Sequence, residues 1–116
     1  MLDIFKDRRT QKRIPQTIET NFKILDNPAM QEIEYKKAQI KNISLGGLCF
    51  QLNQALKAGN MLRVNFVLNE FNKKVDTFCE VKWCKRVVDG FLAGISFVTL
   101  TKEEEENINN FISQYN

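Results

Sequence analysis

The stretch Leu62-Arg63-Val64-Asn65-Phe66-Val67-Leu68 decides the fold class, because an apolar side chain stands at every second position. Successive side chains of a β-strand point to opposite faces, so this alternation indicates a strand with one face toward a core. On the other face, Arg63 and Asn65 would meet solvent. The same alternation occurs in residues 18–24, 48–52, 79–83 and 91–97, and less regularly in 34–43.

Short polar or glycine-containing connections separate these six stretches. In 79–83 the alternation places Trp83 on the core face together with Cys79 and Val81. The predicted turns lie at residues 26–28, 46–47, 53–60, 69–73 and 89–90. No helical stretch of about 10–15 residues intervenes, which argues against a parallel α/β sheet. We therefore predict an all-β fold, a small antiparallel barrel of six strands, whose closure removes exposed strand edges.

The end of the chain changes its periodicity. The apolar residues Ile108, Phe111, Ile112 and Tyr115 fall on one face of a helix. A capping box is predicted at Thr101-Lys102-Glu103-Glu104, where a hydroxyl and a carboxylate satisfy backbone donors at the helix start. A helix over about residues 101–115 should therefore pack on one end of the barrel.

The net charge of +3 is confined to the start of the chain. Residues 1–13 carry five cations and two anions, whereas the remaining residues carry twelve of each sign. A nucleic-acid-binding domain usually spreads its basic residues over a folded face, so this distribution disfavours one. An acidic run, Glu103–Glu106, suits the positive end of the helix dipole and indicates a solvated helix start.

Composition excludes several kinds of chemistry. The chain of 116 residues has no histidine, which excludes catalytic triads and metal sites that depend on it. Its cysteines, Cys49, Cys79 and Cys84, are odd in number and lack C-x-x-C spacing, so we expect packing roles in a reducing cytoplasm. Neither a signal peptide nor an apolar run of about 18 residues is present, and no membrane association is expected.

A basic segment precedes the first predicted strand. It runs Arg8-Arg9-Thr10-Gln11-Lys12-Arg13 and contains an R-x-x-x-R pair, Arg9 and Arg13. The planar guanidinium group binds phosphate or a guanine edge through two hydrogen bonds and stacks on flat rings. Taken alone, the segment also fits a solvated basic tail.

A second polar motif, Asn42-Ile43-Ser44-Leu45-Gly46-Gly47, lies between two predicted strands. Asparagine and serine suit a turn, and Gly47 permits either a positive φ or the close approach of a ligand. By itself the motif also fits an ordinary strand connection.

Together, the R-x-x-x-R pair and the N-x-S-x-x-G motif followed by Leu-Cys-Phe resemble the PilZ domain. Later features of the same family are Leu56 with Gly59, Val81-Lys82-Trp83 and Gly94-Ile95-Ser96-Phe97. The resemblance extends over nearly the whole chain. It implies a six-stranded antiparallel PilZ-type β-barrel that binds cyclic di-GMP, a bacterial second messenger.

The resemblance also assigns residues to the ligand. The arginines would hold its phosphates and guanine edges, while the second motif would meet the other guanine from the barrel. The residues so assigned are Arg9, Arg13, Asn42, Ser44 and Gly47, with Arg8 in a secondary role toward a second, stacked ligand molecule. Family members carry Asp or Asn at the first position of this motif. A neutral asparagine offers one acceptor oxygen and should hold guanine less strongly than aspartate would.

The sequence thus predicts a flexible arm at residues 1–15 and a barrel with its helix at 16–116. We expect a bacterial cytoplasmic adaptor that binds cyclic di-GMP, signals to an unidentified protein effector, and regulates motility or biofilm formation as a monomer or ligand-linked dimer. Two alternatives remain open: a PilZ-like interaction module that binds no nucleotide, and a small nucleic-acid-binding barrel. No cofactor is expected. Nor is an enzyme, since no acid–base pair or phosphate loop is evident.

Overall fold

A computed structural model describes residues 14–25, 35–68 and 73–114 of the chain. It contains six strands, in chain order β1 (Ile14–Ile24), β2 (Lys36–Ile43), β3 (Gly47–Leu52), β4 (Met61–Leu68), β5 (Lys73–Val87) and β6 (Gly90–Phe97). One helix follows, α1 (Lys102–Ser113). Strand β1 thus begins within the last two residues of the segment predicted to be an arm, and residues 1–13 lie outside the described part.

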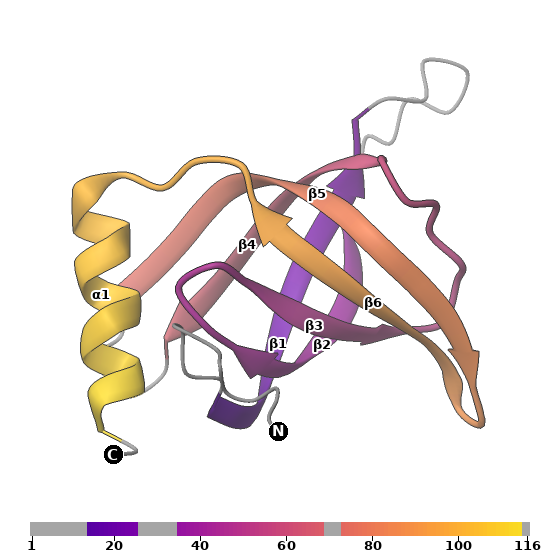
Figure 1. Cartoon of the computed structure of the whole chain (residues 1–116), viewed down its shortest axis with the longest axis horizontal. Coiled ribbons are helices and arrows are strands. Elements are labelled where there is room, and N and C mark those ends of the chain that lie inside the picture. Colours follow the sequence, from indigo (N-terminus) through magenta and orange to yellow (C-terminus); the bar gives the residue numbers. More distant parts are fainter. Residues whose placement is uncertain (1–13, 26–34, 69–72, 115–116) are drawn as a thin grey trace, which may run out of the picture.

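The six strands form a closed antiparallel barrel in the order β1-β2-β3-β6-β5-β4 (Figure 1). The prediction of a six-stranded antiparallel barrel with a C-terminal helix is confirmed. Alternation along the strands sorts the side chains as expected: Leu62, Val64 and Phe66 are buried, whereas Arg63 and Asn65 between them are partly exposed. Closure of the barrel encloses a single apolar core, to which every strand contributes side chains.

Helix α1 lies against one end of the barrel, as Figure 1 shows. Its apolar side chains Ile108, Phe111 and Ile112 are buried in the same core as the strands. The predicted capping box is present, since Thr101 and Glu104 exchange hydrogen bonds between side chain and backbone. The second carboxylate oxygen of Glu104 accepts a hydrogen bond of 3.0 Å from the backbone N–H of Asp76, which ties the helix start to β5.

One sequence-based assignment is wrong: Trp83 does not belong to the core. The register between β5 and β6 shifts between Val81, opposite Ile95, and Trp83, opposite Gly94. Such a β-bulge adds one residue to a strand and reverses the alternation beyond it. The indole of Trp83 therefore stands on the outside of the barrel, 45% exposed.

The three cysteines are free thiols, as expected of packing residues. Burial, with a smaller contribution from Glu104, raises the pKa of the Cys79 thiol to about 12. Within the described ranges, no three His, Cys, Asp or Glu side chains lie close enough together to hold a metal ion. None of the helices found in those ranges is long and apolar enough to cross a membrane.

Candidate functional site

Four residues form a row across the outer surface of β2, β3, β6 and β5. Strand register places Asn42 opposite Cys49, Cys49 opposite Gly94, and Gly94 opposite Trp83. Residues opposite one another in antiparallel strands share a face of the sheet. Since the neighbours of Cys49 along β3 point into the core, this row faces outward, and we call it the outer row.

At one end of the outer row, the indole of Trp83 lies directly against Gly94. A Cβ atom at Gly94 would stand 2.2 Å from Trp83 Nε1 and 2.4 Å from Trp83 Cε2. Glycine therefore makes room for the ring on the barrel surface. Lys85 lies nearby, with its Nζ atom 5.8 Å from the centre of the Trp83 ring. An aromatic ring next to a cation suits a flat, negatively charged ligand.

A cavity of about 490 Å³ opens at the other end of the outer row. Its apolar walls come from β3, β6 and the turn between β5 and β6. Its polar lining residues are Lys41, Asn42, Gln51 and Asp89, so the cavity holds one cation and one anion. The lining residues are Lys41, Asn42, Cys49, Gln51, Val87, Val88, Asp89 and Leu92. An apolar hollow with a few polar groups is the usual form of a small-molecule site.

Ser44 lies in the turn that leads from β2 to β3, and Gly47 is the first residue of β3. The buried Ser44 hydroxyl donates a hydrogen bond of 3.4 Å to the Gly47 carbonyl and accepts one of 3.2 Å from the Gly46 N–H. Between the backbones, the Ser44 N–H donates a bond of 2.8 Å to the same carbonyl. In this structure Ser44 therefore shapes the turn that follows Asn42.

The lack of a side chain at Gly47 allows β3 to pair closely with β6. A Cβ atom there would stand 2.0 Å from the Ile95 carbonyl oxygen and 2.9 Å from the Ser96 Cα atom. Both atoms belong to backbone and have little freedom to move away. The glycine of the N-x-S-x-x-G motif thus has a structural role, whatever contact it makes with a ligand.

The predicted ligand residues Arg8, Arg9 and Arg13 lie outside the described residues. The start of β1 is nevertheless placed beside the second motif, because Ile14 pairs with Ile43 and Pro15 with Asn42. Ile14 directly follows Arg13 in the sequence. The fold therefore leads the chain from the R-x-x-x-R segment into the barrel next to Asn42.

Sequence reasoning missed the outward position of Trp83 and the cavity beside Asn42. The cavity combines residues from four elements, which only the register brings together. Gly94 was a local signal that could have indicated the outward position of Trp83, since glycine inside a strand often marks a bulge or the close approach of another group.

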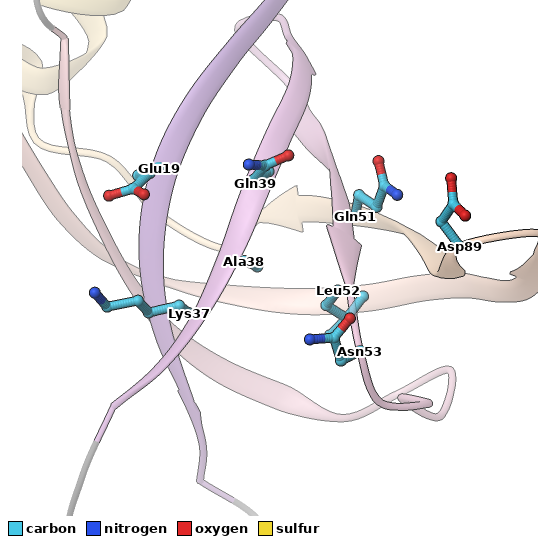
Figure 2. A pocket seen from close by; sticks show the side chains of 8 residues that line it. All are labelled: Glu19, Lys37, Ala38, Gln39, Gln51, Leu52, Asn53 and Asp89. Atoms are coloured by element: carbon cyan, nitrogen blue, oxygen red, sulfur yellow. The ribbon is translucent and has the colours of Figure 1, made fainter.

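A second hollow, of about 320 Å³, adjoins this surface and shares Gln51 and Asp89 with the cavity beside Asn42. Figure 2 shows its side chains, which include Glu19, Lys37 and Gln39. It contains no residue of either motif and none of the outer row, whereas Asn42 lines the cavity beside the outer row. A dianionic ligand with flat rings therefore fits the outer row better than it fits this hollow.

Comparison with known proteins agrees with the fold and with the predicted family. The family model of the PilZ domain matches residues 7–114. The PilZ domain of YcgR from Escherichia coli, solved with c-di-GMP, superimposes with a TM-score of 0.70 at 17% identity, over 92% of this chain and 90% of that one. The comparison with curated proteins finds no significant match.

Two other solved structures share the fold. The inhibitor of motility MotI/DgrA from Bacillus subtilis has a TM-score of 0.76 at 16% identity, over 93% of this chain. The present chain spans about half of that protein, 51% of its length. The PilZ domain of CeSA from a cellulose-synthesizing bacterium has a TM-score of 0.62 at 12% identity, over 90% of this chain and 97% of that one.

Proposed function

This chain belongs to the PilZ domain family, and we propose that it is a receptor for cyclic di-GMP that binds the messenger on the outer row. The observation that carries the proposal is the position of Asn42. It stands at a cavity of about 490 Å³, beside the start of β1 and in line with Trp83. The YcgR domain with the same fold was solved with this messenger, which supports the choice of ligand.

The chemistry of the messenger matches the groups available here. Cyclic di-GMP carries two negative charges and two guanine bases. Arg9 and Arg13 bind its phosphates and a guanine edge through charge-assisted hydrogen bonds. The side-chain oxygen of Asn42 accepts a hydrogen bond from the Watson–Crick edge of a guanine. The Trp83 ring offers a stacking surface to a base, a contact that contributes about 1–3 kcal/mol per base in nucleic-acid complexes.

We further propose that the protein is an adaptor without catalytic activity. The absence of histidine from the chain supports this proposal. Binding orders the arm that carries Arg9 and Arg13 against the barrel and thereby changes the surface offered to an effector protein. We place the protein in the bacterial cytoplasm, in the control of motility or biofilm formation. It acts as a monomer, or as a dimer when Arg8 holds a second, stacked messenger.

Calorimetric titration with cyclic di-GMP tests this function. We expect saturable binding by the wild-type chain and an affinity about 10-fold lower for Trp83→Ala, which loses the stacking surface. Lys102→Ala is the control, because it removes an exposed cation at the start of α1, away from the outer row. The site would be misplaced if Trp83→Ala and Lys102→Ala bound the messenger equally well.

A further inference from the structure

The hairpin of β5 and β6 extends past the end of β4, whereas β3 pairs with β6 as far as Phe91 (Figure 1). The pairing of β5 with β4 ends at Glu80, opposite Met61, whereas β5 continues to Val87. Its last residues pair with β6 on one side only. We call the other side of Lys85–Val87 the β5 edge.

Few contacts cover the β5 edge. The connection between β3 and β4 exchanges backbone hydrogen bonds with β5 at Val81. Further along β5, the Leu56 N–H donates a hydrogen bond of 3.4 Å to the Cys84 Sγ atom. Among the described residues, no backbone hydrogen bond from outside the hairpin reaches Lys85–Val87. An uncovered strand edge of this kind can accept a further strand from another chain.

The charge of the hairpin is uneven. Lys82 is paired with Glu80 at 3.3 Å, whereas neither Lys85 nor Arg86 forms an ion pair with a described carboxylate. Their cationic groups lie over aromatic rings instead, with Arg86 Cζ 5.9 Å from the centre of the Phe91 ring. Lys85–Val87 therefore carries two cations, one on each face of the strand, while the adjoining turn carries the exposed carboxylate of Asp89.

The tip of the hairpin adds an exposed apolar group. Val88, in the turn between the two strands, is 99% exposed. Beside it, Val87 and Leu92 line the cavity on the outer face. An incoming segment would thus find backbone groups, two cations and an apolar contact within a few residues.

From these observations we propose that the β5 edge is the docking site for an acidic, extended segment of a partner protein. The segment adds a strand to β5, places its carboxylates on Lys85 and Arg86, and covers Val88 with an apolar side chain. A second copy of this chain is a poor occupant, because pairing two such edges would bring like charges together. The β5 edge shares Lys85 and Val87 with the candidate messenger site, so the peptide is tested in the absence of messenger and its binding is judged independently.

A labelled peptide of alternating valine and glutamate, acetylated and amidated, tests the proposal by fluorescence anisotropy and amide chemical shifts. We expect binding that shifts the amides of Lys85–Val88. Charge reversal in Lys85→Glu/Arg86→Glu should weaken it by about 10-fold or more. The matched control Lys73→Glu/Lys102→Glu reverses two exposed charges, at the opposite end of β5 and at the start of α1, and should change the affinity less than about 2-fold.

Two comparison peptides make the test decisive. One carries lysine for glutamate, and the other carries proline for valine, which keeps the charge but removes backbone donors. Both should fail to bind. Equal binding of the proline peptide, shifts confined to another face, or a hairpin-mediated dimer in sedimentation would each overturn the proposal.

Discussion

Gly47→Ala is expected to destabilise the protein by about 3 kcal/mol or more, at the upper end of the cost of overpacking. The added Cβ atom would stand 2.0 Å from the Ile95 carbonyl oxygen, well inside van der Waals contact, and 2.9 Å from Ser96 Cα. Relief requires β3 and β6 to separate where Gly47 pairs with Ser96. Because the barrel is closed, that separation disturbs the neighbouring pairs as well. Urea denaturation followed by circular dichroism measures the loss.

Gly59→Ala is the matched control for this substitution. Gly59 has a φ of +95° but no heavy atom within 4 Å of a Cβ. Its replacement brings backbone strain alone, about 1–2 kcal/mol. If Gly47→Ala cost no more than Gly59→Ala, the close approach of β3 to β6 would be refuted. The denaturation curves are also needed to interpret binding data, since a Gly47 variant that fails to bind the messenger could simply be unfolded.

Arg9→Ala and Arg13→Ala should each lower the affinity for cyclic di-GMP by about 100-fold, because each removes charge-assisted hydrogen bonds of about 1.5–3 kcal/mol. The double substitution should leave no measurable binding. Both residues precede β1 in the chain, so circular dichroism and the free energy of unfolding should stay unchanged. Calorimetric titration, run beside the denaturation curves, gives both quantities.

Lys12→Ala separates specific arginine contacts from the general charge of the segment. It removes the same unit charge between the two arginines and should lower the affinity by only about 2-fold, as expected for a charge that acts through screened attraction alone. Arg13→Lys should recover only part of the affinity, since an ammonium group lacks the planar fork of arginine. Equal losses for Lys12→Ala and Arg13→Ala would contradict the role given to the arginine pair.

Much of the fold could be predicted because the strands are buried on one face. Alternation in residues 62–68 requires only that each side chain point opposite to its neighbours, and the barrel preserves this. Thr101 and Glu104 were equally predictable, since a capping box is local in sequence. Trp83 was not, because one inserted residue at the β5 bulge reverses the alternation without changing the composition of the strand.

The candidate site was predictable in its motifs but not in its shape. Asn42 could be assigned from the N-x-S-x-x-G pattern, whereas its neighbours Leu92 and Val87 come from the distant hairpin. Ser44 and Gly47 illustrate a second limit. Their pattern pointed to a ligand, yet the structure also gives each a packing reason, which depends on the position of β6.

Amide chemical-shift mapping during titration with cyclic di-GMP is the most direct test of the central claim, that the messenger binds on the outer row. Trp83 is the single tryptophan, so its indole N–H gives one assignable side-chain signal. We expect the largest shifts at that indole, at Gly94 and at residues 42–47. Saturable binding whose largest shifts lie around Lys37 and Gln39, or a folded sample that shows no shifts at all, would contradict the account.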